Sequence, residues 1–196
     1  MWDKDQCVFP EKCADNEGRV WSSLALLLPL IILRPRAQIY GIHLILLTVA
    51  SIWYWSSGSF ASRVADGILV ALLPFALLTW LADKSSTIIA YGVALLFYLV
   101  LGECHSLGEL SNLPSWLAYL VVIFMLLTWP DMSYQVKLLL AAGVLFAIGS
   151  AILLIATAAG LSKLTWCADG FDNVTLGHLL TGIALFILVF AKNKQP

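Results

Sequence analysis

The longest stretch without a Lys, Arg, Asp or Glu runs from residue 37 to residue 62 and has the sequence AQIYGIHLILLTVASIWYWSSGSFAS. One helical crossing of a bilayer core needs about 20 consecutive apolar residues. We therefore expect a transmembrane helix over residues 38–57. A membrane β-strand would be about 10 residues long with alternating hydrophobicity, and this stretch has neither property.

The same pattern recurs along the whole chain. The 196 residues are 61% hydrophobic and 12% charged, with a formal net charge of −1 and a mean hydropathy of +0.90. A soluble domain carries about twice that charged fraction, so a soluble enzyme, a nucleic-acid-binding protein and a disordered scaffold are excluded. The uncharged runs are 20–33, 37–62, 67–82, 85–102, 110–130, 138–162 and 173–191.

These runs predict an all-α membrane protein with a seven-transmembrane-helix bundle, formed as a single domain over residues 1–196. The first run is short, but the flanking Arg19 and Arg34 can extend their charged groups toward the interfaces. The expected helices are 20–36, 38–57, 64–82, 86–103, 115–130, 135–158 and 174–192.

The distribution of charge predicts the orientation of a multi-pass integral membrane protein. Seven crossings place the termini on opposite sides, and ten of the twelve acidic residues fall on the side of the N-terminus. Arg34 and Arg36 follow the first expected helix directly, on the other side. By the positive-inside rule, the N-terminus is exoplasmic and the C-terminus cytoplasmic.

All four cysteines fall on the predicted exoplasmic side and outside the expected helices: Cys7, Cys13, Cys104 and Cys167. An even number of cysteines on the oxidising side indicates two disulfides, with three possible pairings. The alternative is four free thiols that share this side by chance. The absence of a CxxC pair argues against a thiol oxidoreductase.

Polar side chains in the expected helices gather near the exoplasmic side. Ser51 lies near the end of the second helix, Asp66 near the start of the third and His178 near the start of the seventh. Ionisable residues inside a membrane are functional candidates, and we expect Asp66 and His178 to face one water-accessible cavity. The alternative is structural: Asp66 pairs with Arg63, and His178 makes a hydrogen bond between helices.

Glu103, His105 and His43 each have a functional and a structural interpretation. Glu103 and His105 could bind a metal together with His178, although a solvated loop is the alternative. His43 lies alone among aliphatic residues, where a neutral, hydrogen-bonded histidine is the alternative to a functional one.

In the sixth expected helix, a stripe of small residues predicts close helix packing: Gly143, Ala147 and Ala151.

The placement of Ser51, Asp66 and His178 resembles that in the alkaline ceramidases and the wider CREST superfamily of seven-helix membrane hydrolases. In that family a serine and a histidine one turn later end the second helix. An aspartate opens the third helix, and a His-x-x-x-His pair opens the seventh. The resemblance implies that Ser51 supports the oxyanion, that Asp66 handles the proton and that His178 binds zinc.

The N-terminal segment extends the resemblance, with Asp5, Cys7 and Trp21 at the family's spacing. The family also places a cysteine before the last helix, where this chain has Cys167. The resemblance therefore implies a Cys7–Cys167 disulfide, which leaves Cys13 to pair with Cys104.

The chain departs from the family at two zinc positions, which hold Trp55 and Val174. A catalytic zinc site needs three protein ligands. A zinc cofactor would thus require a rebuilt site, formed by His178 and His105 with Glu103 or Asp66.

Three hypotheses of function follow, and whether the chain is an enzyme stays open. The first is a ceramidase-like hydrolase that acts on a lipid amide or ester bond. The second is a non-enzymatic seven-helix protein of the same architecture: a lipid-binding, receptor-like or accessory protein. The third, a small transporter component, is disfavoured because paired intramembrane charges and an internal repeat are absent from the sequence. The expected partner is a membrane lipid rather than a nucleic acid, and the oligomeric state is left open.

Overall fold

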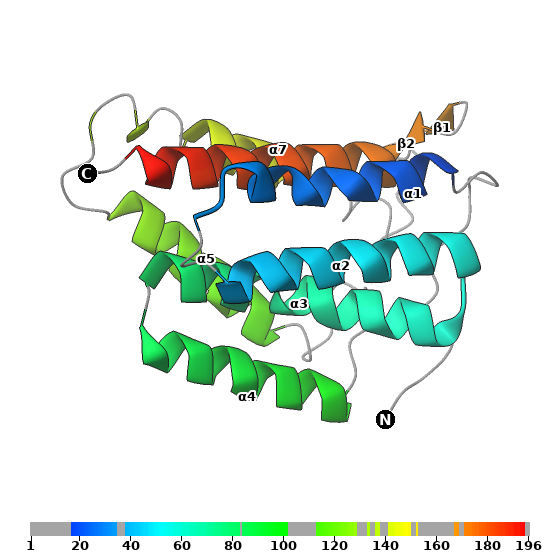
Figure 1. Ribbon diagram of the computed structural model, residues 1–196, viewed down its shortest axis with the longest axis horizontal. Helices are drawn as coiled ribbons and strands as arrows, with labels where there is room; N and C mark the ends of the chain where they lie inside the picture. The colour runs from blue at the N-terminus through cyan, green and yellow to red at the C-terminus, as the bar shows by residue number, and fades with distance from the viewer. Residues whose placement is uncertain are drawn as a thin grey trace. The chain divides into compact units, whose positions relative to one another are not determined.

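The computed structural model describes residues 17–34, 38–82, 84–101, 113–128, 133, 136–137, 141–149, 152, 167–168 and 171–194. This part of the chain is helical except for loops and one short hairpin of two strands, β1 (Cys167–Ala168) and β2 (Phe171–Asp172) (Figure 1). The prediction of an all-α chain is confirmed for these residues.

Three of the described helices are long and apolar enough to cross a membrane: α2 (Gln38–Ser57), α3 (Phe60–Ala82) and α7 (Asn173–Asn193). A helix of about 20 residues is about 30 Å long, which matches the hydrocarbon core of a bilayer. Two further apolar helices are shorter: α4 (Ser85–Leu101) and α5 (Leu113–Leu127). The membrane character predicted from the composition is thus supported by three helices.

The start of the described chain differs from the single helix expected over residues 20–36. An α-helix, α1 (Glu17–Ser23), continues as a 3₁₀-helix, η1 (Leu24–Ile31). Pro29 lies inside η1 and lacks the N–H that an α-helical ladder would need. The prediction of a helix reaching residue 36 was wrong, because the segment turns out of the helix at Ile32, whose N–H donates to the carbonyl of Pro29.

The third helix begins four residues before its expected start at residue 64. Ser59 precedes it, and its hydroxyl accepts a hydrogen bond from the N–H of Ser62 at 3.2 Å. Such a serine satisfies one of the N–H groups left open at a helix N-terminus. The turn from α2 into α3 is made by Gly58, whose φ of 59° is in the left-handed region that favours glycine.

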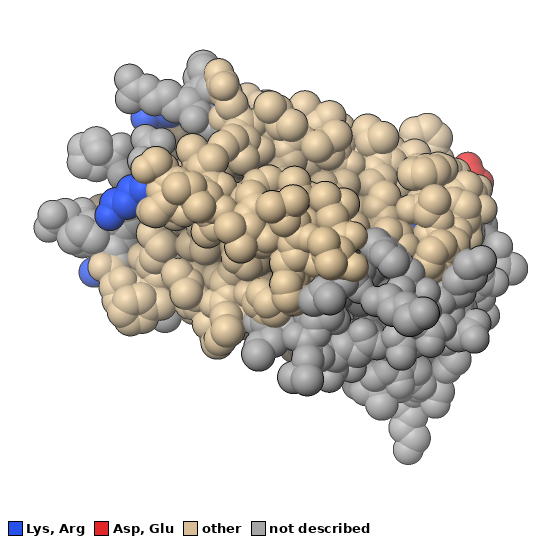
Figure 2. Space-filling view, turned by 90° about the horizontal axis from the view of Figure 1, so that it is seen from below, with Lys and Arg blue, Asp and Glu red and all other residues tan. Residues whose placement is uncertain are grey.

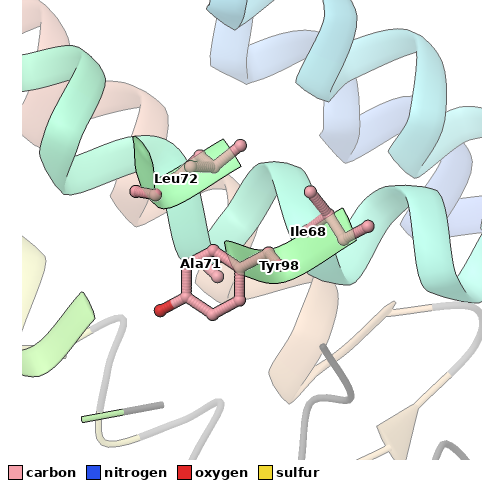
Figure 3. Packing of buried hydrophobic residues seen from close by; sticks show 5 residues of the cluster. Ile68, Ala71, Leu72 and Tyr98 are labelled. Carbon is pink, nitrogen blue, oxygen red and sulfur yellow. The ribbon is translucent and has the colours of Figure 1, made fainter. Parts of the chain in front are cut away.

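The described residues cluster into two compact units, and the first comprises residues 35–125 with α2 to α5. Here α2 and α3 form an antiparallel hairpin, and α3 packs against α4. Figure 3 shows part of the core, where the ring of Tyr98 lies beside Ala71. The hydroxyl of Tyr98 is hydrogen-bonded to Ser115, which donates in turn to the carbonyl of Ala71 at 2.7 Å. This chain of bonds links α4, α5 and α3.

The second unit comprises residues 10–34 and 126–196, so it contains both the first and the last described helix. In Figure 1, α1 and η1 run alongside α7. The two backbones approach each other closely at Gly182, where an added Cβ would collide with the backbone of Ala25. Residues 141–149 are helical, within the expected 135–158, and an added Cβ at Gly143 would lie 3.2 Å from Leu188. Close packing predicted from the small-residue stripe is thus present at Gly143, whereas Ala147 is exposed and Ala151 lies outside the described residues.

Large apolar side chains cover much of the described surface. Ile89 is 67% exposed, Val100 is 72% exposed and Phe124 is 65% exposed. In Figure 2, most of the surface of the described residues belongs to residues other than Lys, Arg, Asp and Glu. Exposed apolar side chains that gather into large patches are typical of surfaces that contact a membrane or another protein.

Candidate functional site

The predicted site residues that the structure describes lie in different units. Ser51 and Asp66 are in the α2–α3 hairpin of the first unit, and His178 is in α7 of the second. The cavity expected between Asp66 and His178 therefore stays a prediction. Five predicted residues fall outside the described part of the chain, and their roles stay predictions as well: Cys7, Cys13, Cys104, Glu103 and His105.

The α2–α3 hairpin brings Ser51 and Asp66 to the same level. Ser51 lies six residues before the end of α2, and Asp66 lies six residues after the start of α3. Positions equally far from the turn of an antiparallel hairpin lie opposite each other. The guanidinium of Arg63 lies 5.9 Å from the ring centre of Tyr54, one turn closer to the loop, which supports this register.

Both side chains are buried in this apolar hairpin. Ser51 is 1% exposed and Asp66 is 4% exposed. Tyr54 and Trp55 are also buried, with their ring centres 4.2 Å apart. Placing a carboxyl group among apolar side chains is costly unless a partner stabilises it. A buried serine and aspartate at one level can hydrogen-bond the polar part of a ligand, the serine as donor or acceptor and an ionised aspartate as acceptor.

A second cluster lies where α1 meets the start of α7. The guanidinium of Arg19 forms an ion pair with Asp172, with Nε at 2.6 Å and Nη2 at 2.5 Å from Oδ2. The two side chains are 4% and 6% exposed. The other oxygen, Oδ1, accepts hydrogen bonds from the backbone N–H and the hydroxyl of Thr175 at 2.8 and 3.0 Å. Asp172 therefore caps α7 and ties it to α1 at the same time.

His178 lies in this second cluster and contacts two serines of α1. Its Nδ1 is 3.0 Å from Oγ of Ser22 and 3.4 Å from Oγ of Ser23. The structure thus contains the bond between helices that was the alternative interpretation of His178. Ser22 and Ser23 were missed as site residues, although two adjacent serines at the head of an apolar run were a usable signal.

His43 likewise has a partner on another helix. Its Nδ1 is 3.0 Å from the hydroxyl of Tyr91 in α4, and the two rings meet edge to face with centres 5.8 Å apart. The imidazole is 1% exposed. This is the hydrogen-bonded arrangement that was the alternative to a functional His43.

The described residues do not fit the zinc site that the family resemblance implies. Trp55 and Val174, at two of the three zinc positions, are 6% and 1% exposed, and neither side chain offers a nitrogen lone pair to a metal. No group of three or more His, Cys, Asp and Glu that could hold a metal occurs among the described residues. The rebuilt zinc site of His178 and His105 with Glu103 or Asp66 stays a prediction, because His105 and Glu103 lie outside the described residues.

Comparisons with known proteins identify no relative. No protein-family model, no curated protein and no solved structure matches the chain.

Proposed function

We propose that this chain is a seven-span membrane protein that binds a membrane lipid near its exoplasmic side without hydrolysing it. The observation that carries this proposal is the pair of buried polar residues, Ser51 and Asp66, at one level of an apolar hairpin. Polar groups inside a membrane are costly and are typically kept where they bind something. The misfit of Trp55 and Val174 to a zinc site weighs against a metal-dependent hydrolase.

Seven crossings are supported by the lengths of the shorter segments. α1 and η1 together cover residues 17–31. A 3₁₀-helix rises about 2.0 Å per residue against about 1.5 Å for an α-helix, so this segment is about 26 Å long. Shorter spans can be accommodated by local thinning of the bilayer or by long flanking side chains. α4 and α5 are also short spans that could be accommodated in this way. The uncharged run 138–162 would supply the seventh span.

Lipid binding is tested by mass spectrometry of lipids that purify with the protein from a mild detergent. We expect one lipid class to be enriched over total membrane lipid, and to be depleted in the Ser51→Ala and Asp66→Asn variants. Ser56→Ala is the matched control, because Ser56 is an exposed serine of the same helix. Equal lipid content in all three variants contradicts the proposal, provided that each variant remains folded.

The topology is tested by reporter fusions. Green fluorescent protein at the C-terminus should fluoresce, because that end is expected in the cytoplasm, whereas alkaline phosphatase there should be inactive. Phosphatase activity at the C-terminus would show that the number of spans or the orientation is wrong.

A lipid hydrolase is the second candidate, favoured by the hydroxyl–imidazole pair of Ser22 and His178 at 3.0 Å. The hydrolase predicts release of fatty acid from lipid amides or esters by purified protein, and loss of that activity in His178→Ala. Metal analysis of the same samples separates the routes: bound zinc that is lost in His178→Ala supports a metal-dependent hydrolase. Lipid retained without turnover supports the binding protein.

A further inference from the structure

We propose that η1 is a conformational switch. Two anchors on α7 hold η1 in the longer 3₁₀ winding, and release of the anchor at the end of α7 lets it shorten into an α-helix. The switch goes beyond lipid binding and does not depend on it.

The winding of η1 needs a cause. Its eight residues, Leu24–Ile31, are all 3₁₀-helical, whereas 3₁₀ runs longer than about four residues are uncommon because their hydrogen-bond geometry is poorer than that of an α-helix. Pro29 removes one N–H, which usually kinks or ends an α-helix at that point. A single proline does not account for 3₁₀ winding that already begins at Leu24.

The first anchor lies near the start of α7. Arg19 of α1 pairs with Asp172, and Oγ of Ser22 lies 3.0 Å from Nδ1 of His178. Arg19, Ser22 and Asp172 are buried. These contacts fix the segment before η1 to the first turns of α7.

The second anchor lies at the other end of α7. Nδ2 of Asn193 donates to the carbonyl of Ile32 at 2.7 Å, and Nη2 of Arg34 donates to the carbonyl of Asn193 at 3.0 Å. Ile32 directly follows η1, so both ends of η1 are fixed to α7. Arg34 is exposed and Asn193 is only partly buried, so this second anchor is the one that can open.

The spacing of the two anchors explains the winding. The separation between partners grows from 156 residues at Ser22 and His178 to 161 residues at Ile32 and Asn193. Ten residues of the first segment therefore run beside fifteen residues of α7 (Figure 1).

These two stretches have different lengths if both are α-helical. Fifteen α-helical residues rise about 22 Å, and ten would rise only about 15 Å. With the residues of η1 at the 3₁₀ rise of about 2.0 Å each, the first segment rises about 19 Å. The 3₁₀ winding thus supplies most of the missing length, and the hydrogen-bonding side chains of the anchors span the rest.

Opening the second anchor removes the need for this length. η1 would then rewind at about 1.5 Å per residue, and its end at Ile32 would move about 4 Å along α7 toward α1. α7 is long and apolar enough to cross a membrane, and the anchors lie near its opposite ends. The switch would therefore link events at the two faces of the membrane.

NMR of the full chain in detergent micelles distinguishes the two windings. Because the 3₁₀-helix has fewer residues per turn, it brings Hα of residue i close to the amide proton of residue i+2, whereas an α-helix brings it close to that of residue i+4. We expect the i+2 contacts over residues 24–31 of the wild-type protein. The Arg34→Met/Asn193→Leu double variant removes the guanidinium and the Nδ2 donor, and should replace them with i+4 contacts.

Lys194→Gln is the matched control. Lys194 is the next residue after Asn193, and its ammonium lies 5.3 Å from the ring centre of Phe190. This variant keeps both anchors and should leave the contacts unchanged. Pro29→Ala also keeps both anchors and should retain the i+2 contacts.

Contacts of the i+4 kind in the wild-type protein overturn the proposal, as do unchanged i+2 contacts in the folded double variant. Rewinding of η1 in Pro29→Ala overturns it as well, because the proline rather than the anchors would then set the winding. If the double variant fails to fold, Pro29→Ala decides, since it leaves both anchors in place.

Discussion

Asp172 shows how a single side chain can fix two helices. One carboxylate oxygen pairs with Arg19 of α1, and the other accepts two hydrogen bonds from Thr175 in the first turn of α7. A buried charge is tolerated only when its partners replace the water it has lost. The stability of this end of the second unit should thus depend strongly on both members of the pair.

Replacing Arg19 with Met should destabilise the protein by about 3–5 kcal/mol, since it leaves the carboxylate of Asp172 buried without its cation. Thermal unfolding in detergent, followed by circular dichroism, measures the loss. The Arg19→Met/Asp172→Asn double variant should recover part of it, because asparagine still caps α7 and carries no charge. Equal destabilisation of the single and the double variant would contradict this account.

The bond between His43 and Tyr91 gives a second prediction for single residues. Tyr91→Phe keeps the aromatic ring against His43 but removes the hydroxyl, and we expect a loss of about 1–3 kcal/mol because a buried ring nitrogen loses its partner. The same substitution in a His43→Met background should cost much less. A double-mutant cycle measures this difference, and strict additivity would show that the bond contributes nothing.

The contact between α7 and η1 depends on a small residue. α7 approaches η1 closely at Gly182, where there is no space for a Cβ beside the backbone of Ala25. The 3₁₀ geometry of η1 and its Pro29 set the path of the backbone that α7 meets. Packing of this kind requires glycine for the close approach of two backbones.

Gly182→Ala should displace η1 from α7 and cost about 1–3 kcal/mol through overpacking. Gly92→Ala is the matched control, because Gly92 lies in the interior of α4 and an added Cβ there meets nothing within 4 Å. That control should stabilise the protein by about 0.5–1 kcal/mol, since alanine is the better helix former. Similar unfolding temperatures for the two variants would contradict the close contact at Gly182.

For the whole molecule, the expected position of all four cysteines on the exoplasmic side of the membrane leads to a prediction about their oxidation state. Both pairs should be oxidised if the N-terminus, the residues near Cys104 and the segment before α7 share the exoplasmic side. Peptide mapping without reduction should recover Cys7 linked to Cys167 and Cys13 linked to Cys104. Four alkylated thiols in unreduced protein would contradict both the disulfides and the assignment of this side.

The positions of the helices followed from the spacing of the charges. The expected helix over residues 38–57 coincides with α2, and α7 differs from its expected bounds by one residue at each end. The largest disagreement is at the first helix, because a sequence pattern does not show that residues 24–31 wind as a 3₁₀-helix. The early start of α3 depends on the cap by Ser59, a contact within the turn that hydropathy does not register.

The sequence by itself determined the all-α class and the candidate residues Ser51, Asp66 and His178, and it predicted the membrane character that three apolar helices support, because hydropathy and charge spacing are properties of the chain. Only the tertiary structure decided which side chains meet. His178 contacts Ser22, and Arg19 pairs with Asp172, across separations of 156 and 153 residues. No local pattern contains such pairings, since they arise from the packing of the first helix against the last.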